Sequence, residues 1–116
     1  MELELVTKYL LPDEIDNYFN LVSIEEKAGD ILYLFLDERP IKPQEHSDKE
    51  LISKGFHPKV TIQDFPLRGR AVYLIVRTRK WKDKSTGKVY STQWDLTAKG
   101  TSYTAEFAAF LKELLG

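Results

Sequence analysis

One stretch, residues 63–82, most constrains what this chain can fold into, because it joins a turn, an apolar strand and a run of cations. Its turn, residues 65–69, places Pro66 where a φ of about −65° is needed and Gly69 where a positive φ is easily adopted. After the turn, core and surface residues alternate with a period of two, which predicts a strand. The side chains expected to face the core are Val72, Leu74 and Val76.

Beyond these positions the same strand becomes cationic and carries an indole. The residues concerned are Arg77, Arg79, Lys80, Trp81 and Lys82. Lysines are rarely buried, so we expect the strand to leave the core near Thr78. The polar residues 83–87 predict a tip, and residues 88–96 predict a strand that returns beside the first. The expected result is a long hairpin with a cationic, aromatic end.

Charge is distributed unevenly along the chain. Residues 1–67 carry seven Lys/Arg and fourteen Asp/Glu, whereas residues 68–116 carry ten and four. Within residues 68–88 there are eight cations and one anion, Asp83. Such a split indicates a folded body with one side that faces a polyanion. The alternative is a solvated hairpin whose charges only prevent edge-to-edge aggregation.

Length and composition indicate one domain over residues 1–116. The chain has no cysteine, which excludes disulfides, Cys-type zinc sites and Cys nucleophiles. No apolar run approaches the ~20 residues of a transmembrane helix, so we expect no membrane insertion. The acidic N-terminus does not resemble a signal peptide, and a cytoplasmic location is expected.

The remaining segments predict an α+β domain. Two N-terminal helical turns, in residues 2–10 and from Pro12 onward, are expected to pack with a mostly antiparallel sheet of about five strands. A C-terminal helix from Tyr103 to Leu115, capped by Thr101 or Ser102, covers one face. The strands expected outside the hairpin are residues 21–27, 31–36 and 59–63.

Two segments carry more particular expectations. The continuous apolar run of residues 31–36 predicts a strand that is covered on both faces, at the centre of the core. Residues 37–55 predict a surface connection with a short helical turn near residues 48–53. No metal or cofactor site is expected, because the two histidines lack partners with ligand spacing. No nucleophile or phosphate-loop motif is present.

Three segments together resemble the N-terminal region of ISAon-type insertion-sequence transposases. They are Val60-Thr-Ile-Gln-Asp-Phe-Pro66, Val72-Tyr-Leu-Ile-Val-Arg-Thr-Arg-Lys-Trp81 and the segment from Trp94-Asp-Leu-Thr-Ala-Lys-Gly100 to Leu111. The resemblance covers roughly residues 10–115. The strand with its cations is also distantly similar to the N-terminal zinc ribbon of ISL-type transposases. That ribbon has cysteine pairs where this chain has Trp81, Lys82, Asp83 and Gly87, so the tip is expected to be held without metal.

The resemblance implies a role in DNA transposition, either recognising element ends or docking onto a DDE-type catalytic subunit. Cations on the hairpin are consistent with DNA recognition, since they neutralise phosphates. A two-stranded ribbon can enter the major groove, where Arg77 or Arg79 can pair with guanine. Trp81 can stack on a base or pack under the hairpin. The residues expected at DNA are Arg68, Arg70, Arg77, Arg79, Lys80, Trp81, Lys82, Lys84 and Lys88.

We therefore expect a non-catalytic DNA-binding or accessory module of a bacterial transposase, associated with the nucleoid when bound. Two alternatives stay open. One is a protein-interaction module that docks onto the catalytic subunit through the acidic N-terminal half or the last helix. The other is an enzyme, supported by scattered carboxylates such as Asp64 and Asp95.

Overall fold

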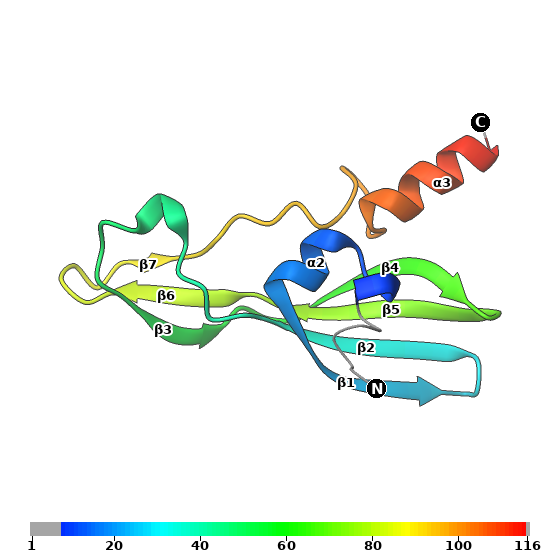
Figure 1. Ribbon diagram of the computed structural model, residues 1–116, viewed down its shortest axis with the longest axis horizontal. Coiled ribbons are helices and arrows are strands. Elements are labelled where there is room, and N and C mark those ends of the chain that lie inside the picture. The colour runs from blue at the N-terminus through cyan, green and yellow to red at the C-terminus, as the bar shows by residue number, and fades with distance from the viewer. Residues whose placement is uncertain (1–7, 116) are drawn as a thin grey trace.

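The computed structural model describes residues 8–115 and has the α+β architecture that the sequence predicts. Within these residues, seven strands form a sheet of four strands and a sheet of three, with helices above them (Figure 1). The large sheet has the order β1-β2-β5-β4, and the small sheet β3-β6-β7. The elements are α2 (Asp13–Tyr18), β1 (Phe19–Lys27), β2 (Ile31–Glu38), η1 (Gln44–His46), β3 (Leu51–Phe56), β4 (Val60–Leu67), β5 (Arg70–Arg77), β6 (Arg79–Asp83), β7 (Val89–Tyr90) and α3 (Ala105–Leu115).

A long antiparallel ribbon runs through both sheets. One arm is β3 followed by β4, and the other is β5 followed by β6. The arms meet at a two-residue turn in which Arg68 and Gly69 both have positive φ, as a type I′ hairpin requires. Pairing extends from there to Leu51 opposite Asp83, at the far end of the small sheet. Between the two sheets, the N–H of His57 donates to the carbonyl of Thr78 at 2.8 Å, so the two arms stay in contact where the ribbon passes from one sheet to the other, a point that we call the bend.

The predicted long hairpin therefore exists, but with a different partner strand. Its second arm comes before the turn, in residues 51–67, and the predicted return strand over residues 88–96 is wrong except for β7. The physical reason is that Trp94 and Leu96 pack against the core of the large sheet, which draws the chain away from β6. The expectation that the strand leaves the main core near Thr78 is confirmed, because β5 ends at Arg77 and β6 enters the small sheet.

The large sheet is built around a parallel pair, β2 and β5, and its other pairs are antiparallel. In this pair Ile31 lies opposite Ala71, Leu34 opposite Leu74, and Asp37 opposite Arg77. Parallel neighbours cannot be joined by a tight turn, so the connection from β2 to β5 is long and includes β3 and β4. The prediction of mostly antiparallel pairing is thus confirmed. The parallel pair of β2 and β5 was not predicted.

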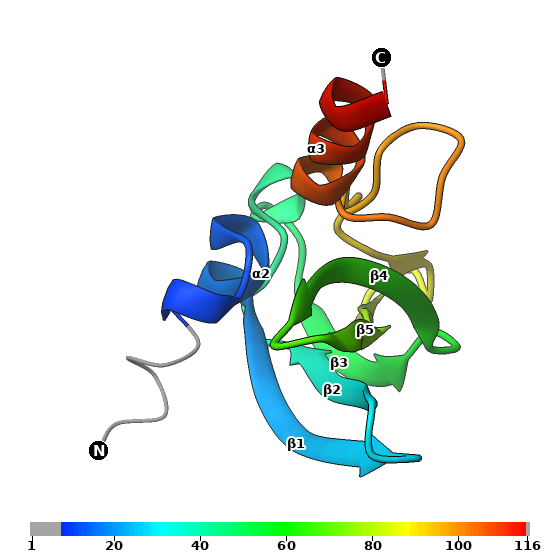
Figure 2. The ribbon, with the colours of Figure 1, turned by 90° about the vertical axis from the view of Figure 1, so that its right-hand side faces the viewer.

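The core lies on one side of the large sheet. Val72, Leu74 and Val76 are buried there, as predicted, and they pack with residues of β2, α2 and β1. In both views α2, α3 and η1 lie on that side of the sheets (Figure 1, Figure 2). The opposite side, which we call the open side, has no helix on it among residues 8–115. The expectation that residues 31–36 are covered on both faces is therefore wrong, and Tyr33 and Phe35 are only half-buried.

The segment between the two sheets differs from its prediction. Residues 51–56 form β3, where a surface connection was expected, and the helical turn lies at residues 44–46 and not near 48–53. Only Leu51 of β3 is buried, so the strand has no apolar alternation that would reveal it. Its pairing with β6, far along the chain, determines its conformation. The predicted helix over residues 2–10 lies outside the described residues except at residues 8–10, which are helical.

The C-terminal helix begins at Ala105, later than predicted, because Thr104 caps it. The Thr104 hydroxyl accepts the Phe107 N–H at 3.3 Å and donates to the buried carboxylate of Asp64 at 2.9 Å. Tyr103 precedes the helix and bridges to Gln63 at the edge of β4. Asp64, one of the scattered carboxylates, thus has a structural partner. No helix within residues 8–115 has the length and apolarity needed to cross a membrane.

We predict that Thr104→Val lowers the free energy of unfolding by about 2–3 kcal/mol, because it removes the helix cap and the donor to a buried carboxylate. Thr101→Val is the matched control, since the Thr101 hydroxyl also makes two hydrogen bonds, donating to the Ala98 carbonyl and accepting the Tyr103 N–H, but in an exposed turn, and it should cost less than about 1 kcal/mol. Urea denaturation followed by circular dichroism measures both. Equal losses would contradict the role given to Thr104.

Candidate nucleic-acid interface

The nine residues predicted to contact DNA lie in two separate places. Arg68 and Arg70 are at the turn between β4 and β5, at one end of the molecule, whereas the other seven extend from the bend to the opposite end (Figure 1). The longest dimension of the fold is 50 Å. The structure therefore does not gather these residues into one patch, and each group has to be considered separately.

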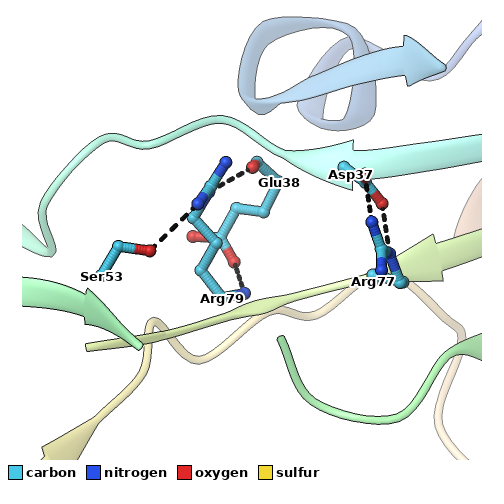
Figure 3. A network of polar contacts seen from close by, with 5 residues as sticks. All are labelled: Asp37, Glu38, Ser53, Arg77 and Arg79. Atoms are coloured by element: carbon cyan, nitrogen blue, oxygen red, sulfur yellow. Dashed lines mark hydrogen bonds and ion pairs between the residues drawn. The ribbon is translucent and has the colours of Figure 1, made fainter. Parts of the chain in front are cut away.

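Two of the arginines form ion pairs with carboxylates of the first two strands. Arg70 donates through Nε to Glu26 at 2.8 Å. Arg77 makes a bidentate contact with Asp37, in which Nε donates to Oδ1 at 2.7 Å and Nη2 donates to Oδ2 at 2.6 Å (Figure 3). The hydrogen bond to Asp37 is the main cause that raises the pKa of Arg77 above its ordinary value. Both guanidinium groups are thus engaged within the large sheet.

Arg79 is held at the bend by the end of β2. Its Nε donates to the carbonyl of Glu38 at 2.7 Å, and its Nη1 donates to the hydroxyl of Ser53 at 3.1 Å (Figure 3). The ring of Phe56 lies against two guanidinium groups, 4.1 Å from Arg77 and 4.7 Å from Arg79. The arginines at the bend therefore join β2 to the ribbon.

The carboxylate of Glu38 is the centre of this junction. Its side chain is 2% exposed, and one oxygen, Oε1, accepts both the backbone N–H of Arg79 at 2.9 Å and the Nε1–H of Trp94 at 3.0 Å. Trp94 in turn packs against Tyr18 and Phe19, with ring centroids 5.2 Å away in each case. Glu38 thus connects the large sheet, the start of β6 and the segment that leads to α3.

Trp81 is inside the small sheet and not on its surface. It is 3% exposed, and its neighbours in the register are Ser53 and Tyr90. The ring of His46, in η1, lies 4.3 Å from that of Tyr90 and covers this side of the sheet. Of the two roles considered for Trp81, packing under the hairpin is the one observed. In this conformation the Trp81 ring is not exposed for stacking on a base.

Four lysines remain at the far end of the ribbon, and we call them the lysine face: Lys80, Lys82, Lys84 and Lys88. Lys82 lies opposite Ile52 and Val89, which are both exposed, so it points away from Trp81 and η1. Alternation along the strand places Lys80 on the same side. None of the four forms an ion pair with another of the residues 8–115. Their charge is therefore available to a polyanion.

The tip that carries the last two lysines is held by a set of local hydrogen bonds. The Asp83 carboxylate accepts the N–H of Ser85 at 2.9 Å and its hydroxyl at 2.8 Å, and these bonds, the hydroxyl first, lower the pKa of Asp83. Gly87 has φ +76° and donates to the carbonyl of Asp83 at 2.8 Å, which closes the turn. The stabilisation from the Asp83 carboxylate is complete above its ordinary pKa of 3.8 and is lost as the pH falls through the lower folded-state pKa.

Sequence reasoning missed Asp37 and Glu38 as partners of the cations. The signal was present, because Asp37-Glu38 ends one apolar run and Arg77-Thr78-Arg79 ends another. Pairing these carboxylates with these arginines from the sequence would have required knowing that β2 and β5 are parallel neighbours. Within residues 8–115 no group of three or more potential metal-ligating side chains comes together.

We predict that Glu38→Gln costs about 1 kcal/mol of stability, because the amide oxygen still accepts both hydrogen bonds. Glu38→Ala should cost about 2–4 kcal/mol, since it leaves the Arg79 N–H and the Trp94 indole without an acceptor. Chemical denaturation of both variants measures the difference. Equal losses would show that the junction does not depend on this acceptor.

The comparisons of this chain with protein-family models, curated proteins and solved structures found no match.

Proposed function

We propose that this chain is a non-catalytic DNA-binding module that contacts phosphates through the lysine face. The observation that carries the proposal is the placement of four lysines, unpaired within residues 8–115, on one end of the ribbon. Of their acidic neighbours, Asp83 is buried and bonded to the tip, whereas Glu50, whose carbonyl accepts the Lys84 N–H, is exposed. Lysines arranged in this way neutralise backbone phosphates and release counterions, which gives affinity.

The arginines support a binding mode without base recognition. An arginine that recognises guanine in the major groove needs two guanidinium N–H groups free to donate to the base. Arg77 and Arg79 use theirs on Asp37, Glu38 and Ser53. Lysine acts as a point charge, so the proposed contact depends on phosphate position and carries little sequence information.

The carboxylates support a non-catalytic role. Asp37, Glu38, Asp64 and Asp83 each accept hydrogen bonds that hold the fold together. The resemblance to ISAon-type transposases favours DNA as the polyanion and suggests an accessory module whose catalytic domain lies elsewhere.

We predict that replacing all four lysines of the lysine face with Gln weakens binding to a short labelled duplex by at least about tenfold at low salt. The slope of log K against log salt should fall by about 3, at about 0.9 for each phosphate that is no longer neutralised. Fluorescence anisotropy at several salt concentrations measures both quantities.

The matched control replaces Lys8, Lys42, Lys99 and Lys112 with Gln, which removes the same charge from elsewhere on the fold. It should retain most of the affinity. Unchanged binding by a folded lysine-face variant, or equal loss in the control, would contradict the proposal.

A second candidate function, docking onto another protein, is supported by α3. Only Phe107 of this helix is buried. Two further apolar side chains of the helix are exposed, Phe110 at 47% and Leu114 at 68%. The Phe65 ring lies beside that of Phe110, with the ring centroids 5.4 Å apart. An apolar stripe of this kind on an amphipathic helix is a typical protein-binding feature.

If this second function holds, the chain should co-purify with the product of a neighbouring DDE-type reading frame after nuclease treatment. Phe110→Ser with Leu114→Ser should abolish the capture, because it removes the apolar stripe. The control pair Lys112→Ser with Glu113→Ser, on the polar part of the helix, should not. Capture that depends on intact DNA would count against direct docking.

A further inference from the structure

The open side of the large sheet carries an aromatic patch at its centre, formed by Tyr33, Phe35, Tyr73 and Ile75. The parallel register places Tyr33 opposite Tyr73, and Phe35 opposite Ile75. The two tyrosine rings are stacked, with centroids 5.7 Å apart and planes 22° apart. The three aromatic side chains are half-buried, and the helices of residues 8–115 all lie on the other side (Figure 2). The two tyrosines turn one ring face toward each other, and Lys27 lies over the Tyr33 ring, so the patch presents to solvent only the remaining half-exposed parts of its rings.

A pocket of about 270 Å³ continues this patch toward the bend. Phe35 and Ile75 provide apolar lining, and Lys59, Asp37 and Arg77 add polar and charged groups; Val22 and Ser23 complete it. A planar heterocycle could lie on the apolar residues while its edge meets the charged ones. This combination of an apolar surface with a few polar groups is typical of small-ligand sites.

The charges around the patch favour an anionic ligand. On the open side Asp37 is paired with Arg77, whereas Glu25, which lies opposite Tyr33, forms no ion pair within residues 8–115. Lys27 lies over the Tyr33 ring, 5.2 Å from its centroid, and Lys59 borders the pocket. Lys80 and Lys82 of the lysine face lie on the same side, because η1 covers the opposite side of the small sheet (Figure 1). One surface thus joins stacked aromatics to the lysine face.

We propose that this open side binds single-stranded nucleic acid, a proposal that rests on the proposed function and adds the strand class. Unpaired bases pack against the exposed parts of the Tyr33 and Tyr73 rings, one base occupies the pocket at Phe35, and the backbone continues toward Lys80 and Lys82. Aromatic rings and cations on an exposed sheet are the two elements that single-strand binding uses. A duplex hides its base faces, so it can use the lysines but not the aromatic patch.

The test compares a labelled oligothymidylate with a duplex of equal length, by anisotropy at one salt concentration. The full chain should bind the single strand at least about tenfold more tightly than the duplex. Tyr33→Leu with Tyr73→Leu should remove most of this preference, because leucine keeps the site apolar but has no ring. Tyr9→Leu is the control, since Tyr9 is an exposed tyrosine outside the patch.

The outcomes separate this inference from the proposed function. If duplex binds as tightly as single strand, and the tyrosine variant binds like the parent while the lysine-face variant does not, the proposed function stands and the single-strand inference is wrong. If no nucleic acid binds at low salt, both are wrong. If size-exclusion chromatography shows a dimer that the tyrosine variant loses and that excludes nucleic acid, the patch is a protein interface and the inference is overturned.

Discussion

The bend of the ribbon at Thr78 is the constraint on which the rest of this structure depends. Here β2 ends, and its last two residues, Asp37 and Glu38, meet Arg77 and Arg79 on either side of the bend. The Glu38 carboxylate also accepts a hydrogen bond from the indole N–H of Trp94. One buried carboxylate therefore connects β2, the start of β6 and the segment that leads to α3. Without this junction the orientation of the small sheet would depend mainly on the ribbon itself. The positions of the aromatic patch and the lysine face both follow from it.

Sequence periodicity predicted the local elements well. The α2, β1, β2 and β5 segments, the buried faces of Val72, Leu74 and Val76, and the departure near Thr78 all follow from apolar spacing and turn residues. Pairing partners were not predictable in the same way. Residues 88–96 alternate as a strand would, but Trp94 packs its ring against the core of the large sheet and does not continue the ladder. β3 has almost no apolar signal, and β6 is its partner only in three dimensions.

The candidate site illustrates why a run of cations is hard to interpret from sequence alone. Eight cations occur close together along the chain, but burial and pairing divide them into two kinds. The arginines of the large sheet and the bend act as multiple hydrogen-bond donors inside the fold, for which their planar fork is well suited. The lysines remain at the solvent. An interface predicted from the run of cations alone therefore includes arginines that are engaged inside the fold. It also includes Trp81, which is buried in the small sheet.

The turn of Arg68 and Gly69 has a consequence at the other end of the molecule. Side chains on a strand alternate, so a slip of one residue in pairing exchanges the two faces of every strand that follows. At this turn the register of both arms begins, and the irregularities at Asp64–Leu67 and Ser53–Phe56 are the places where it is adjusted. A slipped ribbon would turn Trp81 to water and Lys80 and Lys82 toward η1. The geometry of two residues thus decides, across the full length of the fold, which charges the protein shows to its surroundings.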